Sequence, residues 1–540
     1  MQYLTAVILS LCLFVSSLDG QDLHQKIDQL FMDVYHPGAP GLSVLIAKGE
    51  QILYERQIGL ANLENEVAID ASSLFSVGSI TKQFTVAALL QLEAKHQLQL
   101  TDLVVKHLPK MAKAIPEVTI EQLLHHTSGV PDYPRLKAIR QVIRNEPSVE
   151  ELIRLALTEV PVFPPGTDYQ YSNTGYLLLG KVIEAISDQP LEAYFQQHIF
   201  KPAGMMNSQL MDFTTVLPNR TTPYTYDEDL GVLRSTPHAY SYAAGGLWSN
   251  PRELLRWMHA LRAGKIISPA SLRRMFPAAS TTEQSPYYGW EVNEIAGQLS
   301  YEHTGFEPGY KASSIYLPAQ DIYLIAVQNT ENGSPTPPLI KAAALCLGKP
   351  YPTPEVSHGD VTLMDRFVGK YSFSEGKERI VRLEDGKLSY QAPGRLPRPL
   401  YLLDSLTLFF GDGYRQLTLE QASGDKPPSL TYRNRRYIEI GQLTDKEIGE
   451  KRRAIVLPLE TLAQFAGEYQ TEHFLMNIML EDGQLYAQPE GSDRLPLTAY
   501  ADHKFHIPEI GAELEFKAVD GIWKEVRILL EGDLHVGKRR

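Results

Sequence analysis

The chain has 540 residues, and at about 100–200 residues per domain this is too long for a single ordinary core. Hydrophobic residues make up 43% and charged residues 21%, which excludes a mostly disordered chain, and Gly and Pro are too few for a collagen-like protein. With 64 acidic against 51 basic residues the net charge is −13, so the sequence lacks the electrostatic footprint of a nucleic-acid-binding protein.

The chain opens with an apolar segment. Residues 4–15 form a run shorter than the ~20 residues that a membrane-spanning helix needs, and small or polar residues follow it. We therefore expect residues 1–20 to be a secretory signal peptide, and the protein to be periplasmic or secreted without a stable membrane span. Removal of the signal takes Cys12 with it. Cys346, in the apolar context AAALCL, is then left without an internal disulfide partner and is expected to be a buried structural thiol.

Strand-like and helical patterns alternate through residues 21–350. Two β-rich runs flank a turn at 48–50, which predicts a hairpin, and apolar residues recur every three to four positions over 80–97, which predicts a helix. This order predicts an α/β domain with a mainly antiparallel sheet and a helical middle. The further expected elements are helices near 120–126, 149–158, 174–186 and 252–263, and strands near 313–317 and 322–329.

A proline-rich segment, 335–358, is expected to mark a domain boundary, and an internal repeat follows it. Phe367, Gly369 and Tyr371 recur in the same order at 465, 467 and 469, and the tetrapeptide LEDG recurs at 383–386 and 480–483. Each copy is short and consists of strand patterns separated by turns. We therefore expect two small antiparallel β-barrels, at 360–455 and 456–540, which avoid open edges by closing.

Candidate nucleophiles are limited. No Ser lies in a Gly-x-Ser-x-Gly pattern, whereas Ser-x-x-Lys occurs three times, at 79–82, 374–377 and 423–426. The last two lie in turn-like segments. Ser79 instead precedes the predicted helix, which places Lys82 one turn later on the same face and close to the positive end of the helix dipole. A desolvated Lys82 has a lowered pKa and can take the serine proton. The alternative is a helix-start serine with a surface lysine.

Two further motifs add polar groups that suit acyl transfer. Tyr171-Ser172-Asn173 lies in a turn-rich loop that opens into a predicted helix, where a phenol can relay protons and an amide can hold a carbonyl. His303-Thr304-Gly305 leads into a predicted strand, where Gly305 permits close backbone approach and the next N–H can contribute to an oxyanion hole. Taken singly, either motif is also compatible with an ordinary turn.

Together and in this order, these segments resemble the serine β-lactamase and penicillin-recognising family, specifically its class C branch, which includes DD-peptidases, D-aminopeptidases and esterases. The resemblance runs from about Gly41 to about Asn332 and includes FSVGSITKQFT, LLHHTSGVPDY, the YSN segment, AAGGLWSNPREL and HTGFEPGY. It implies the α/β fold of that family, an antiparallel sheet flanked by helices with a helical subdomain. It also explains His125 and His126 as structural residues.

The resemblance further implies a role for each motif. Ser79 would be the nucleophile, Lys82 the base and Tyr171 the proton shuttle, with His303 as a further catalytic residue. The N–H groups of Ser79 and of residue 306 would form the oxyanion hole, and the Tyr171–Lys82 pair would activate water for deacylation. The substrate-binding residues implied in the same way are Asn173, Thr304, Gly305 and Phe306.

One departure from the family pattern concerns the third motif. β-Lactamases of this branch usually carry Lys-Thr-Gly there, whereas His303 is familiar among its peptidases and esterases. The two-barrel tail is similar in architecture to the lipocalin-like domains that follow the catalytic domain of D-aminopeptidases. We expect no metal and no other cofactor, because no phosphate-binding glycine loop occurs and His503 and His506 lack a nearby cluster of Cys or carboxylates.

The resulting hypothesis is an exported serine hydrolase that forms an acyl-enzyme on an amide or ester, with a D-amino-acid-containing peptide as the first choice of substrate. Such a substrate can derive from peptidoglycan. One alternative is an esterase or β-lactamase of the same fold. The other is a binding protein that retains the fold without turnover.

Overall fold

The computed structural model describes most of residues 22–540, and the expected signal peptide lies outside this range. The residues that are not described within it are 112–116, 137–146, 212–214, 228–230, 236–240, 278–287, 355–360, 374–377, 393–394, 396, 423–426, 446–454, 473, 490–493, 508–511, 520 and 531–532. The chain divides into two compact units, Met1–Pro350 and Tyr351–Arg540. Among the described residues, no helix is both long and apolar enough to cross a bilayer.

The first unit is built on an antiparallel six-stranded sheet in the order β10-β11-β12-β13-β1-β2. Its strands are β1 (Leu42–Lys48), β2 (Gln51–Ile58), β10 (Glu291–Ile295), β11 (Gln298–Glu307), β12 (Tyr310–Leu317) and β13 (Ile322–Gln328). The predicted hairpin is β1–β2, and both predicted strands of the second half are present. Strands from the two ends of this unit meet where β1 pairs with β13, with Leu45 opposite Ile325.

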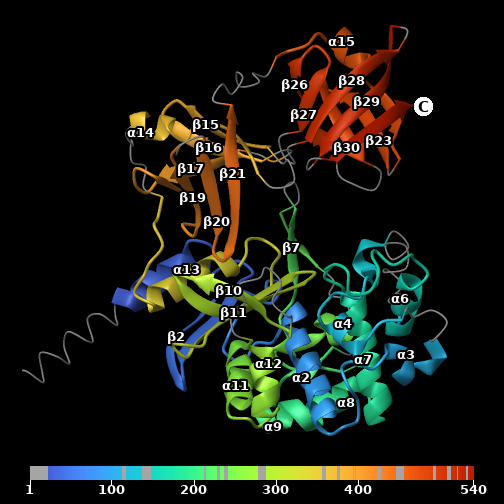
Figure 1. The fold of residues 1–540 in the computed structure, drawn as a ribbon, viewed down its shortest axis with the longest axis vertical. Coiled ribbons are helices and arrows are strands. Elements are labelled where there is room, and N and C mark those ends of the chain that lie inside the picture. The colour runs from blue at the N-terminus through green and yellow to red at the C-terminus, as the bar shows by residue number, and fades with distance from the viewer. Residues whose placement is uncertain are drawn as a thin grey trace, which may run out of the picture. The chain divides into compact units, whose positions relative to one another are not determined.

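Helices cover the sheet and form a second layer beside it, as the sequence predicts. Helices α2, α4 and α8 each pack against α7 in the helical part (Figure 1). Helix α11 packs on β1 and β13. Their bounds, with those of the other helices of this unit, are α2 (Thr81–Ala94), α3 (Val104–His107), α4 (Ile120–Leu124), α6 (Val149–Ala156), α7 (Asn173–Ser187), α8 (Leu191–Phe195), α9 (Lys201–Ala203), α10 (Tyr242–Gly245), α11 (Pro251–Arg262), α12 (Pro269–Met275) and α13 (Thr336–Cys346).

Short strands complete the first unit. They are β3 (Leu60–Asn62), β4 (Val67–Ala68), β5 (Phe75–Ser76), β6 (Gln209–Leu210), β7 (Tyr224–Asp227), β8 (Gly231–Arg234) and β9 (Leu247–Ser249). Strand β9 pairs with both β5 and β6, and the Val77 N–H donates a hydrogen bond to the Leu247 carbonyl at 3.0 Å. This small sheet therefore holds the backbone directly before Ser79.

Two expectations need refinement. The segment 335–358, expected to mark a boundary, contains helix α13, which packs on β12 and β13 and starts with prolines in its first turn, a position that tolerates proline. The division between the compact units falls after Pro350. Helix α2, expected to have one apolar face, is buried around almost its whole circumference from Thr81 to Leu90. A helix enclosed in this way is typical of the centre of a domain.

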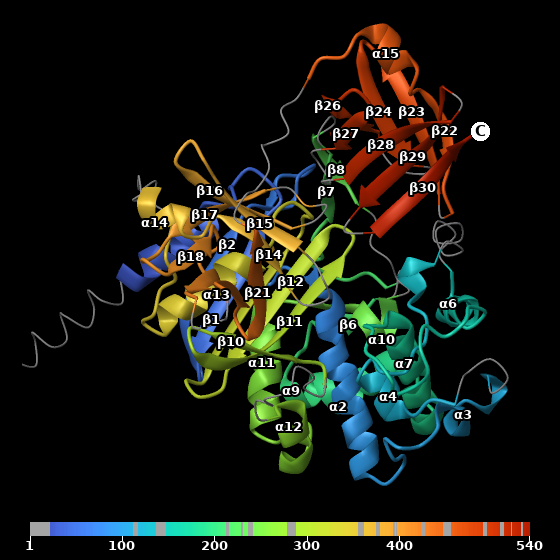
Figure 2. The same cartoon turned by 45° about the horizontal axis from the view of Figure 1, so that its top comes forward.

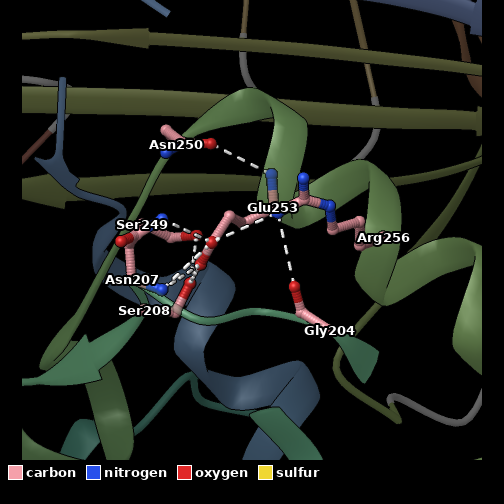
Figure 3. Close-up of polar contacts among 7 residues, drawn as sticks. All are labelled: Gly204, Asn207, Ser208, Ser249, Asn250, Glu253 and Arg256. Atoms are coloured by element: carbon pink, nitrogen blue, oxygen red, sulfur yellow. Dashed lines mark hydrogen bonds and ion pairs between the residues drawn. The ribbon is translucent and has the colours of Figure 1, made fainter. Parts of the chain in front are cut away.

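A buried carboxylate anchors the start of α11, in the segment SNPREL (Figure 3). Glu253 accepts hydrogen bonds from the Asn207 backbone N–H at 3.0 Å, from Asn207 Nδ2 at 3.0 Å and from the Ser208 hydroxyl at 2.5 Å. Asn250 caps the helix by accepting from the Glu253 N–H at 3.0 Å. Because these donors satisfy Glu253 (1% exposed), it ties α11 to the segment that precedes β6.

The second unit holds two barrel-shaped sheets, and Figure 2 shows their strands from a second direction. The first is a closed barrel of eight strands: β14 (Gly369–Ser372), β15 (Glu378–Glu384), β16 (Lys387–Gln391), β17 (Arg398–Leu402), β18 (Thr407–Phe410), β19 (Arg415–Glu420), β20 (Ser429–Asn434) and β21 (Tyr437–Asp445). The second is a nine-stranded sheet: β22 (Gly467–Gln470), β23 (Leu475–Glu481), β24 (Gln484–Pro489), β25 (Leu495–Pro496), β26 (Thr498–Ala501), β27 (Lys504–Ile507), β28 (Ala512–Val519), β29 (Ile522–Leu530) and β30 (Asp533–Arg539). Short helices precede them, α14 (Val361–Asp365) and α15 (Leu459–Ala463).

The repeat in the sequence corresponds to a repeated structural device. In the first barrel the buried Tyr371 hydroxyl donates to the Phe367 carbonyl at 2.9 Å, and in the second Tyr469 donates to the Phe465 carbonyl at the same distance. Both phenylalanines are fully buried in the core of their own barrel. A shared hydrogen bond at matched positions supports a common origin for the two barrels.

Candidate functional site

Ser79 lies in a single 3₁₀ turn, Gly78–Ile80, that leads directly into α2. Its neighbours fix this turn. The Thr81 hydroxyl donates to the Gly78 carbonyl at 2.7 Å, and the Leu247 N–H donates to the Thr81 hydroxyl at 3.0 Å. Gly78 has φ +51°, a backbone conformation that glycine adopts without strain. Ser79 itself is partly exposed, so its hydroxyl is accessible at the start of a buried helix.

Lys82 is not a surface residue, because its side chain is fully buried. Its Nζ lies 3.1 Å from Ser79 Oγ, 2.9 Å from Asn173 Oδ1 and 2.7 Å from the Ala244 carbonyl oxygen. Burial lowers the pKa of Lys82 to about 7, although the carboxylates of Asp132 and Glu307 act in the opposite direction. The structure therefore brings the first and second motifs together and places an amine that titrates near neutrality beside Ser79.

Tyr171 and Asn173 come from the loop before α7 and from its first residue. The Ser172 side chain caps this helix by accepting from the Gly175 N–H at 3.2 Å. The centroid of the Tyr171 ring lies 4.7 Å from Lys82 Nζ. Burial raises the pKa of Tyr171 well above its ordinary value, and a hydrogen bond with Ser79 only partly opposes this shift. At neutral pH Tyr171 is therefore a phenol that can pass a proton.

His126 packs against the Tyr171 ring. The two rings stack with centroids 4.3 Å apart, and His126 Nδ1 accepts a hydrogen bond from the Ser172 N–H at 3.1 Å. Burial lowers the pKa of His126 well below its ordinary value, so the imidazole is neutral. The sequence hypothesis of a structural role agrees with these contacts, but it did not foresee that His126 would support Tyr171 directly.

The third motif lies on β11 and faces the 3₁₀ turn. A Cβ added to Gly305 would lie 1.9 Å from the Val77 carbonyl oxygen, and a Cβ added to Gly78 would lie 2.5 Å from the Phe306 nitrogen. Glycine is therefore required on both sides of this contact. It brings the Phe306 N–H close to the turn that carries Ser79, as an oxyanion hole needs. The side chains of Thr304 and Phe306 are exposed.

His303 is buried, and its ring is neutral. Its Nδ1 lies 2.6 Å from the Thr304 carbonyl oxygen, which can only accept, so Nδ1 carries the proton and Nε2 the lone pair. Burial lowers the pKa of His303 to about 3, and the positive charge of Lys82 adds to the shift. A lysine at this position, as the resemblance implies for β-lactamases, would bring a positive charge that His303 does not.

Two buried carboxyl groups belong to the surroundings of Lys82 and were not singled out from the sequence. Asp132 accepts a hydrogen bond from the Asn173 N–H at 2.7 Å, and burial raises its pKa. Glu307 is 8% exposed, and burial raises its pKa to about 8. Alternation along β11 could have indicated Glu307, because it shares the buried face with His303 and Gly305. Asp132 carries no comparable sequence signal.

Comparison with known proteins identifies the family of this chain. The sequence model of the Beta-lactamase family matches residues 25–348. Penicillin-binding protein 4* of Bacillus subtilis is 29% identical over 398 residues, which cover 68% of this chain and 87% of the relative. A D-aminopeptidase of Brucella anthropi is 26% identical over 307 residues, which cover 55% of this chain and 58% of the relative.

Solved structures share the fold. The octameric penicillin-binding protein homologue from Pyrococcus abyssi has a TM-score of 0.56 and 24% identity, and the match covers 78% of this chain and 99% of that one. The D-amino acid amidase from Ochrobactrum anthropi SV3 has a TM-score of 0.52 and 22% identity, over 60% of this chain and 96% of that one. With the family match over more than half of its length, this chain belongs to the Beta-lactamase family.

Proposed function

We propose that this protein is an exported serine hydrolase that forms an acyl-enzyme at Ser79 on an amide or ester of a D-amino-acid-containing peptide. The observation that carries the proposal is the set of contacts around Lys82 Nζ. Two of them, Asn173 Oδ1 and the Ala244 carbonyl, are oxygens that only accept, and the third is the Ser79 hydroxyl. A neutral amine has two N–H groups for the first two, and its lone pair is then left for the serine proton.

The proposed reaction begins with Ser79 Oγ attacking the substrate carbonyl carbon while its proton moves to Lys82. Because burial keeps Tyr171 protonated, Lys82 rather than Tyr171 is the base in the free enzyme. The N–H groups of Ser79 and Phe306 stabilise the oxyanion. As the tetrahedral intermediate collapses, Tyr171 gives its proton to the leaving amine or alcohol and is reprotonated from Lys82. Water then attacks the acyl carbon of the ester at Ser79, and the Tyr171–Lys82 pair takes its proton. Collapse breaks the bond between Ser79 Oγ and the acyl carbon, and the pair returns this proton to Ser79 as the acid product leaves.

The choice of substrate rests on His303 and on the relatives. A neutral His303 offers no positive charge to the carboxylate of a β-lactam, whereas its Nε2 can accept a hydrogen bond from a neutral amide. Similar proteins include a D-aminopeptidase and a putative D-alanyl-D-alanine carboxypeptidase of Escherichia coli, 25% identical over 338 residues. Export is proposed from the apolar run at residues 4–15 alone.

The test combines labelling with a substrate panel. Wild-type protein and Ser79→Ala are incubated with a fluorescent penicillin and a small p-nitrophenyl ester, and adducts are read by intact mass. We expect an adduct on the wild type and none on the variant, with unchanged circular dichroism. For the wild type, kcat/KM should be higher for a D-alanyl anilide or a short-chain ester than for a cephalosporin. A wild type that takes no acyl group supports the non-catalytic alternative, and a dominant cephalosporin supports a β-lactamase.

A further inference from the structure

Glu307 is a buried carboxyl group that the proposed reaction does not use. It lies on β11 at the end of the buried face that begins with His303, and its side chain points into the first unit. A carboxyl group is rarely buried unless hydrogen bonds or charges compensate for its desolvation. Its partners are therefore informative about why it is there.

The partners of Glu307 lie at the two ends of α10, a single helical turn. The Ser241 hydroxyl, directly before α10, donates a hydrogen bond to the Glu307 carboxyl group. At the other end, a Cβ added to Gly245 would lie 2.7 Å from Glu307 Oε1, so the carboxyl group occupies the space that a side chain there would need. Glu307 thus clamps α10 against β11.

The carbonyl groups of α10 hold the start of α2. The Ala244 carbonyl accepts from Lys82 Nζ at 2.7 Å, and the Ala243 carbonyl accepts from the Thr85 hydroxyl at 2.8 Å. The Ala244 oxygen is also one of the two acceptors that direct the Lys82 lone pair to Ser79. A shift of α10 would therefore rotate the amine away from the serine.

We propose that Glu307 is a positioning residue that, through Ser241 and α10, holds the Ala244 carbonyl in place and so aims the Lys82 amine at Ser79. The inference rests on the proposed function, because it assigns Glu307 a task only if Lys82 is the base. It links the strand that carries the third motif to the orientation of that base.

Electrostatics give the inference a second readout. Glu307, whose pKa is about 8, ionises within the pH range in which Lys82 loses its proton. Its ionised form favours the charged form of Lys82, as does that of Asp132, whereas His303 and His126 are neutral neighbours. A side chain at position 307 that cannot ionise should therefore lower the pKa of Lys82. Acylation needs neutral Lys82 and rises with pH as the amine loses its proton, so the midpoint of this rise should move to lower pH.

The experiment compares Glu307→Gln, Ser241→Ala and a control, Glu253→Gln, with the full-length wild type. Glu253 is also a buried, hydrogen-bonded carboxyl group of the same unit, and it anchors α11 rather than α10 (Figure 3). The acylation rate constant with the p-nitrophenyl ester is measured from pH 5 to 9, together with the melting temperature of each protein. The glutamine keeps the shape of Glu307 but not its charge.

For Glu307→Gln we expect a plateau acylation rate lower by about tenfold or more, because acylation slows steeply when the Lys82 amine is displaced from Ser79. We also expect the midpoint of the pH profile to move to lower pH. Glu253→Gln should lower the melting temperature without moving the midpoint. An unchanged plateau in Glu307→Gln, or an unchanged midpoint, overturns the inference. If Glu307→Gln does not fold, Ser241→Ala is judged by the same two criteria. An unreactive wild type would instead refute the proposed function itself, and the inference with it.

Discussion

The low pKa of Lys82 leads to a quantitative prediction about its replacement by arginine. Lys82→Arg keeps a long cationic side chain but removes the ability to become neutral, because a guanidinium is not deprotonated in proteins. The same burial that lowers the pKa of Lys82 to about 7 cannot bring arginine into a useful range. The substitution thus separates a role as a base from a role as a fixed positive charge.

The magnitude follows from the fraction of neutral amine. With a pKa of about 7, roughly half of Lys82 is neutral at pH 7. An exposed lysine with a pKa near 10.4 would be neutral in only about 1 molecule in 2,500 at that pH. Burial therefore raises the fraction of Lys82 that is neutral at pH 7 about 10³-fold. Arginine is even less able to become neutral than an exposed lysine, so Lys82→Arg should lower the acylation rate by at least this factor, within the 10²–10⁴ range typical of a general base.

The assay is the pH dependence of acylation by the small ester, followed by adduct mass over pH 5–10. The wild-type rate should rise with a midpoint near pH 7 and then level. Lys181→Arg is the matched control, since Lys181 is paired with Glu184 at 3.0 Å on α7. It should leave the profile unchanged. A wild-type rate that keeps rising through pH 9–10, or a Lys82→Arg rate within tenfold of wild type, would refute the assignment of Lys82 as the base.

Two further predictions concern β11. Gly305→Ala should destabilise the protein by ~1–3 kcal/mol in urea unfolding and lower acylation about 10²-fold, because the new Cβ would lie 1.9 Å from the Val77 carbonyl oxygen. Gly38→Ala, where nothing lies within 4 Å of the added atom, should change neither, and equal effects at both sites would contradict this reasoning. For His303, the folded-state pKa of about 3 lies below its ordinary value of 6.5, so between these pH values the unfolded chain binds a proton that the folded chain does not. The free energy of unfolding should therefore fall as pH falls through this window. His303→Gln should reduce the loss measured between pH 7.5 and 4.5, whereas replacement of the exposed His36 by Gln should not; an identical loss in wild type and His303→Gln would count against a buried neutral imidazole.

Much of the local structure could be predicted because it depends on neighbouring residues. The helices α4, α6, α7 and α11 begin and end within a few residues of their predicted positions, since caps and apolar periodicity are local signals. The duplication of the barrels could also be predicted, because the same short motifs recur in the same order in both copies. Helix α13 was missed because the prolines of its first turn resemble a break in structure, although proline is tolerated there.

Sequence spacing alone identifies the candidate nucleophile and base, because Ser79 and Lys82 lie three residues apart and one helical turn brings them together. The burial of Lys82, in contrast, depends on tertiary packing. Its other two partners, Asn173 and Ala244, are 91 and 162 residues away in the chain, and no local pattern indicates such contacts. The same holds for Glu307, which reaches α10 only because β11 packs against the turn before α2. Burial and charge–charge interactions set a pKa, and both arise when distant segments pack together, so the chemistry of Lys82 belongs to the fold rather than to its motif.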